Sequence, residues 1–82
     1  MVNVSDLIIK AVKIEASVKP NEKIIIGEHV FTYSEFAEIL SRRHNSKTEK
    51  KIIGMFLKQA EQLFKSNPEF KNKVLELTGT RE

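Results

Sequence analysis

Apolar residues recur along most of this 82-residue chain at intervals of three and four, the spacing that places side chains on one face of an α-helix. Four segments follow this pattern and predict helices over residues 3–18, 33–43, 47–66 and 68–78. Residues 23–31 differ, because two short apolar runs flank Gly27-Glu28, which predicts a β-hairpin with a type II′ turn. The pattern predicts a mainly α fold of α+β class, with one hairpin between the first and second helices.

The first predicted helix has a wide apolar face. At about 100° per residue its apolar side chains span roughly 160° of the helix circumference. These side chains are Val4, Leu7, Ile8, Ala11, Val12, Ile14 and Val18. Either this helix is central and packs against several others, or part of its face meets a second chain.

Local signals set the boundaries of the later helices. Thr32-Tyr33-Ser34-Glu35 has the form of a capping box, so a helix is expected to begin at Tyr33 and to end near Arg43 or His44. Asn67-Pro68 predicts the start of the last helix, and Gly79 its end. The long helix is expected to bury one stripe, consisting of Ile53, Phe56, Leu57, Ala60, Leu63 and Phe64.

Length and composition exclude several classes of protein. Eighty-two residues form one domain, residues 1–82, and the absence of cysteine excludes disulfides, thiolate zinc sites and cysteine nucleophiles. The longest apolar runs are three residues, whereas a membrane-spanning helix needs about 20. With no signal-peptide pattern at the N-terminus, a cytoplasmic location is expected. Eleven lysines and ten glutamates also suggest, as a hypothesis, a thermophilic source.

Catalytic residues are scarce. His29 and His44 are the only histidines, and neither has the spaced partners that define a metal site. The three glycines are isolated, so there is no phosphate-binding glycine loop. We therefore expect a protein that is not an enzyme and that takes no cofactor, no metal and no small-molecule substrate.

The placement of charge is more informative than its total of +3. Residues 1–41 carry a net charge of −2 and residues 52–82 one of +1. Residues 42–51 carry a net +4, with a single glutamate, Glu49, against five basic residues: Arg42, Arg43, Lys47, Lys50 and Lys51. The basic character is concentrated where one predicted helix ends and the next begins.

A basic stripe extends along the long predicted helix. Lys47, Lys51, Gly54, Lys58 and Lys65 fall on one face, opposite the apolar stripe, over about 27 Å. A glycine inside a helix costs about 1 kcal/mol relative to alanine. Gly54 is therefore either tolerated, or relieves crowding against the first helix, or permits a close approach by a ligand such as a phosphate backbone.

Part of the chain resembles a known family. Phe36-Ala37-Glu38-Ile39-Leu40, a basic turn and then Glu49-Lys50-Lys51-Ile52-Ile53-Gly54-Met55-Phe56-Leu57-Lys58 are similar to the paired helices of helix-turn-helix and winged-helix DNA-binding domains, over about residues 33–58. The resemblance implies that Lys47, Thr48, Lys50 and Lys51 face DNA, with Arg42 and Arg43 on phosphates. The chain departs from the family in its longer connector and in the absence of a hairpin after the long helix.

Two functions follow as hypotheses. The first is nucleic-acid binding through Arg42, Arg43, Lys47, Thr48, Lys50, Lys51, Gly54 and Lys58. Because lysine contacts phosphate as a point charge, affinity would be dominated by the nucleic-acid backbone and sensitive to salt. The alternative is a protein interaction module, an accessory subunit or a homodimer, that uses the apolar face of the first helix or the edge of the hairpin.

Overall fold

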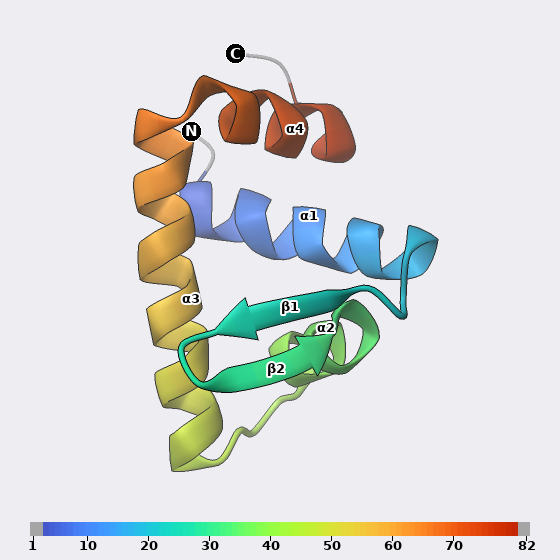
Figure 1. The fold of residues 1–82 in the computed structure, drawn as a ribbon, viewed down its shortest axis with the longest axis vertical. Helices are drawn as coiled ribbons and strands as arrows, with labels where there is room; N and C mark the ends of the chain where they lie inside the picture. Colours follow the sequence, from blue (N-terminus) through green and yellow to red (C-terminus); the bar gives the residue numbers. More distant parts are fainter. Residues whose placement is uncertain (1–2, 81–82) are drawn as a thin grey trace.

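The computed structural model describes residues 3–80, which form four helices and one two-stranded sheet. In chain order the elements are α1 (Val4–Val18), β1 (Lys23–Ile26), β2 (His29–Thr32), α2 (Tyr33–Ser41), α3 (Lys47–Ser66) and α4 (Pro68–Thr78). Figure 1 shows α3 along the length of the molecule, with α4, α1 and the hairpin arranged one below another beside it. The fold is mainly α with a small β-hairpin between α1 and α2, as the sequence pattern predicts.

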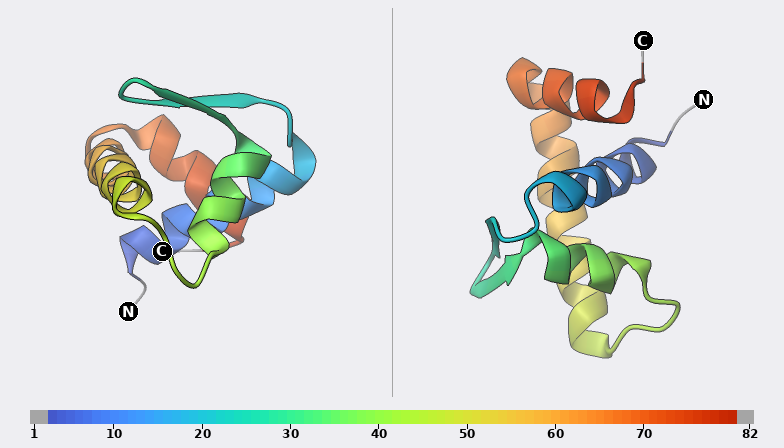
Figure 2. Two further views of the ribbon diagram at one scale, coloured as in Figure 1. Left: turned by 90° about the horizontal axis from the view of Figure 1, so that it is seen from below. Right: turned by 90° about the vertical axis from the view of Figure 1, so that its right-hand side faces the viewer.

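The central element is α1. It packs against α2, α3 and α4, and its buried apolar residues are Leu7, Ile8, Ala11, Val12 and Ala16. Figure 2 shows α1 crossing α3 between α4 and α2. The wide apolar face is thus covered largely within the chain, which is the first of the two explanations for its width.

Two clusters of buried side chains make up the core. Leu7 and Ala11 meet Phe64 of α3 and Val74 of α4 in one cluster. In the other, Val12 meets residues of the hairpin, α2 and α3, namely Ile26, Phe36 and Ile52. Since α1 contributes to both clusters, it joins the two halves of the molecule.

The hairpin has the predicted turn. Its strands are antiparallel, and Ile26 pairs with His29 across Gly27 and Glu28. Gly27 has φ 61°, and within residues 3–80 no residue other than glycine has a positive φ. A positive φ at the first central residue, Gly27, without one at the second, Glu28, is the combination of a type II′ turn. A Cβ on Gly27 would lie 2.9 Å from Met55 Cε, the flexible end of a side chain that can shift, so the positive φ and not crowding favours glycine here.

Capping boxes open both α2 and α3. The Thr32 side chain accepts a hydrogen bond from the Glu35 amide, and Glu35 accepts one in return from the Thr32 amide. Ser46 and Glu49 repeat this exchange at α3. The backbone hydrogen bonds hold the pKa of both glutamates below the usual 4.5. Phe31 and Phe36, on either side of the first box, lie with ring centroids 5.9 Å apart, as expected of a hydrophobic staple.

The second helix is shorter than predicted. It ends at Ser41 and not near Arg43, because Arg42 leaves helical geometry with ψ 139°. From there the Arg42 guanidinium reaches back to Glu38 and forward to Glu49. These ion pairs connect the end of α2 to the first turn of α3.

The buried residues of α3 also differ in part from the predicted stripe. Ile52 is buried whereas Leu63 is 44% exposed, although the spacing had placed Leu63 in the core. Ile53, Phe56 and Leu57 are half-buried. The core side of α3 is set by where α1 and the hairpin contact it, and the helix presents Ile52, Ala60 and Phe64 to them.

Candidate nucleic-acid interface

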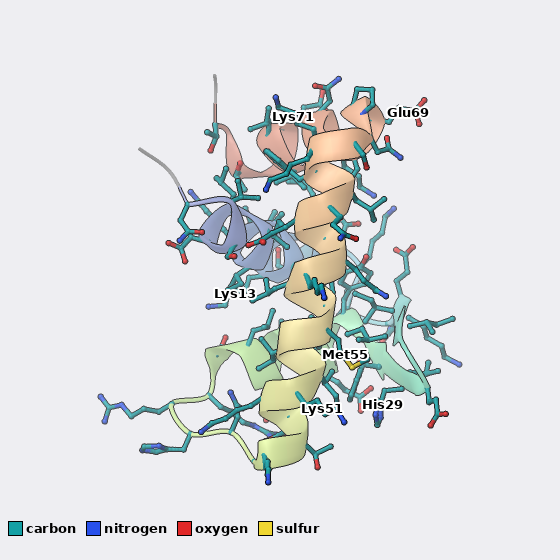
Figure 3. The ribbon with its side chains drawn as sticks, turned by 90° about the vertical axis from the view of Figure 1, so that its left-hand side faces the viewer. Lys13, His29, Lys51, Met55, Glu69 and Lys71 are labelled. Atoms are coloured by element: carbon teal, nitrogen blue, oxygen red, sulfur yellow. The ribbon has the colours of Figure 1, made fainter. Side chains whose placement is uncertain are left out.

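The basic stripe predicted from the sequence lies on the outer face of α3. Lys47, Lys51, Gly54, Lys58 and Lys65 are all exposed, and we call this set the α3 ridge. Figure 3 views α3 from this side, with Lys51 on the half of the helix nearer the hairpin. The structure therefore brings these five residues together on one surface.

The ridge lysines have no acidic partners among residues 3–80, where none of them forms an ion pair. The two glutamates of α3 make other contacts. Glu49 bonds to Ser46 and Arg42, and Glu61 accepts a hydrogen bond from the Ser5 hydroxyl. The positive charge of the ridge is therefore not neutralised within the described chain.

This arrangement is electrostatically unfavourable for the helix. Lys47 and Lys51 are separated by one helical turn, and like charges at that spacing destabilise a helix by about 0.2–0.5 kcal/mol. Lys47 and Lys50 also lie at the N-terminal end, where the helix dipole disfavours cations. A bound anion would relieve both effects.

The other predicted site residues, in the connector and beside the ridge, differ in whether their charge is already paired. Arg42, expected to contact phosphates, is held by two carboxylates, one of them 3.5 Å from its Nη2 atom. Arg43 is exposed and has no ion pair within the described chain. Thr48 and Lys50 are exposed on either side of the ridge. Of the two arginines, Arg43 is the one whose charge remains available.

Gly54 faces open space. A Cβ built there would meet no atom within 4 Å, so glycine is not needed to relieve crowding against α1. Two of the three explanations for Gly54 remain: it is tolerated, or it permits a close approach from outside.

The hairpin tip extends the candidate surface. A hollow of about 350 Å³ lies between the turn and α3, and its lining includes His29, Thr48 and Lys51. Figure 3 shows His29 beside Lys51 and Met55. His29 is exposed, and its ring stacks on Phe31 with centroids 6.1 Å apart. The sequence pattern did not connect His29 to the ridge, because only the folded hairpin places residues 27–29 against α3.

Comparisons with known proteins do not identify this chain: no family model, no curated protein and no solved structure matches it. Within residues 3–80 no helix is both long and apolar enough to cross a membrane. The same residues contain no group of three or more histidine, cysteine, aspartate or glutamate side chains suited to hold a metal ion.

Proposed function

We propose that this protein is a small nucleic-acid-binding module that contacts the phosphate backbone through the α3 ridge. The observation that carries the proposal is the row of exposed lysines without ion-pair partners in the described chain. Arg43, Thr48 and Lys50 flank the ridge and extend its contacts. Arg42 acts mainly by fixing the connector, since its two ion pairs leave less of its charge for phosphate.

The resemblance to helix-turn-helix domains supports DNA as the target. In that family the second helix lies in the major groove, and here α3 presents an outer face without bulky apolar groups. The hairpin tip beside Lys51 would lie next to the same groove. Base reading would be weak, because the ridge lacks the arginine, asparagine and glutamine side chains that form bidentate contacts with bases.

The test is a fluorescence anisotropy titration of labelled duplex DNA, single-stranded DNA and duplex RNA at 50 mM and 200 mM salt. Contacts to about four phosphates predict a slope of log K against log salt near −3.6, which is roughly a 100-fold loss of affinity over this range. Absence of binding to all three probes at 50 mM salt would overturn the proposal.

Replacing Gly54 by alanine separates the two remaining explanations for that residue. The fold is expected to gain about 1 kcal/mol, because the methyl group meets no atom within 4 Å and alanine favours the helix. Thermal unfolding measures this gain. If a phosphate backbone approaches Gly54 closely, G54A weakens DNA binding although it stabilises the fold.

A matched control is Asn72→Ala, at an exposed position in the middle of α4. This change also improves helix propensity but lies outside the α3 ridge, so DNA affinity should not change. Equal affinities for wild type, G54A and N72A would mean that glycine at position 54 is merely tolerated.

A protein partner is the second candidate, and one observation favours it. Ile25 and Val30 pair directly across the hairpin on its outer face, and they are 71% and 57% exposed. Exposed apolar pairs on a sheet with free edges favour association. Sedimentation at high micromolar concentration tests the homodimer form, which a strictly monomeric species would exclude.

A further inference from the structure

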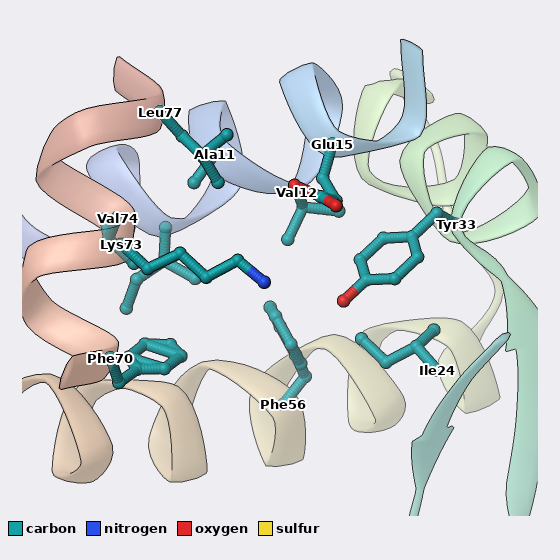
Figure 4. A pocket seen from close by; sticks show the side chains of 11 residues that line it. Ala11, Val12, Glu15, Ile24, Tyr33, Phe56, Phe70, Lys73, Val74 and Leu77 are labelled. Carbon is teal, nitrogen blue, oxygen red and sulfur yellow. The ribbon is translucent and has the colours of Figure 1, made fainter. Parts of the chain in front are cut away.

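A cleft lies between α4 and the hairpin, on the side of the core away from the ridge lysines. Its volume is about 310 Å³, at the lower end of the range for small-molecule sites. In Figure 4 its floor and walls are formed by apolar side chains of α1, α3 and α4, including Val12, Phe56, Phe70 and Val74. Three polar side chains, Glu15, Tyr33 and Lys73, also line it.

Glu15 is the unusual member of this set. It is only 8% exposed, and in residues 3–80 no group donates a hydrogen bond to its carboxylate. Its one ion-pair partner there is Lys19, at 3.9 Å, whose ammonium lies equally far from Glu22. Glu15 also lies in the last turn of α1, where the helix dipole disfavours a negative charge. A cation bound in the cleft would give this carboxylate a second partner.

Tyr33 lies at the same end of the cleft as Glu15, and its environment there is electrostatically negative. Burial raises the pKa of its hydroxyl, and the charges of Glu15 and Glu22 raise that pKa further. The hydroxyl therefore stays protonated through neutral pH and can donate a hydrogen bond. In Figure 4 it points across the cleft toward Lys73.

Lys73 supplies the opposite charge. It extends from α4 over the cleft, and its ammonium forms no ion pair within the described chain. The cleft thus presents a buried carboxylate, a hydroxyl donor and an ammonium around an apolar wall.

We propose that this cleft binds a free amino acid with an apolar side chain. The ligand ammonium pairs with Glu15 beside the Tyr33 hydroxyl, its carboxylate pairs with Lys73, and its side chain packs against Phe56, Phe70 and Val74. A ligand with only a positive charge would pair with Glu15 but be repelled by Lys73. A ligand with only a negative charge would pair with Lys73 but be repelled by Glu15. A zwitterion matches both groups, and the volume of about 310 Å³ accommodates a side chain of the size of leucine or phenylalanine. The sequence pattern predicts no small-molecule ligand, and the cleft is the reason to propose one.

The experiment uses an optical probe that the chain already contains. Tyr33 is the only tyrosine and there is no tryptophan, so intrinsic fluorescence reports on this cleft alone. Titration with L-leucine is expected to change the emission saturably, with a dissociation constant of about 1 mM or below. Isopentylamine and 4-methylpentanoate, which each keep one charge of leucine, should bind at least about tenfold more weakly.

Two variants locate the charges. Glu15→Gln should weaken leucine binding at least about tenfold while the helical circular dichroism is retained. Lys73→Met keeps the apolar stem and should remove the preference for leucine over isopentylamine. Lys10→Met, which removes an exposed lysine of α1 that does not line the cleft, should bind leucine as the wild type does.

Two outcomes would overturn the proposal even if a variant failed to fold, because they are read on the wild-type protein. The first is an unchanged fluorescence and no calorimetric heat with leucine or phenylalanine at 10 mM, which would mean that the cleft binds no apolar amino acid. The second is equal affinity for leucine and isopentylamine, which would mean that the cleft selects a cation and not a zwitterion.

Discussion

Replacing both Lys51 and Lys58 by glutamate is expected to lower the affinity for duplex DNA roughly 100-fold at 50 mM salt. Each side chain lies on the exposed face of α3 with no carboxylate partner in the described chain, so its reversal removes one phosphate contact and adds a repulsion. About tenfold per position corresponds to about 1.4 kcal/mol. Anisotropy titration measures the loss, and the slope against salt should become shallower by about two.

The control for this variant changes the total charge equally at another surface. Lys10→Glu with Lys23→Glu also takes the net charge from +3 to −1, and both lysines are exposed outside the α3 ridge. This double variant should lose much less affinity than the first. If the two variants lose affinity equally, DNA senses only the overall charge and the ridge is not a site.

Phe36→Ala is expected to remove a large part of the stability of the fold. Phe36 is fully buried, and its ring lies 5.9 Å from that of Phe31 and 4.8 Å from that of Phe56. Truncation of a buried phenylalanine costs about 3–5 kcal/mol. A domain of 82 residues has only about 4–12 kcal/mol at typical values per residue. Urea unfolding followed by circular dichroism measures the change.

Ile25→Ala is the comparison for this loss. Ile25 is 71% exposed on the outer face of the hairpin, so its truncation should cost less than about 0.5 kcal/mol. A loss from the Phe36 variant as small as that from the Ile25 variant would mean that Phe36 contributes little to the core.

The elements of the fold were predictable because their signals are local. The capping box at Thr32, the Asn67-Pro68 start and Gly79 in the left-handed conformation each act within one turn of a helix. The end of α2 was not predictable in this way. Arg42 leaves the helix to reach Glu49, seven residues ahead, and that contact exists only once α3 is in place.

The two candidate sites differ in how far the sequence reveals them. The α3 ridge follows from helical spacing alone, and the structure places its residues on one exposed face. For the cleft one signal was present, because Glu15 falls near the centre of the apolar arc of α1 at about 100° per residue. The other polar side chains of the cleft, Tyr33 and Lys73, come from two other helices, so only the packing of α1 against both α2 and α4 reveals the site.

The central position of α1 has a consequence for synthesis on the ribosome. Leu7 and Ala11 complete their cluster only with Phe64 and Val74, which are made more than fifty residues later. Until α4 emerges, the nascent chain exposes part of the apolar face of its first helix, as chains with distant contacts do. The other cluster, with the side chains packed against it, needs nothing beyond Phe56, so the hairpin side of the molecule can assemble first.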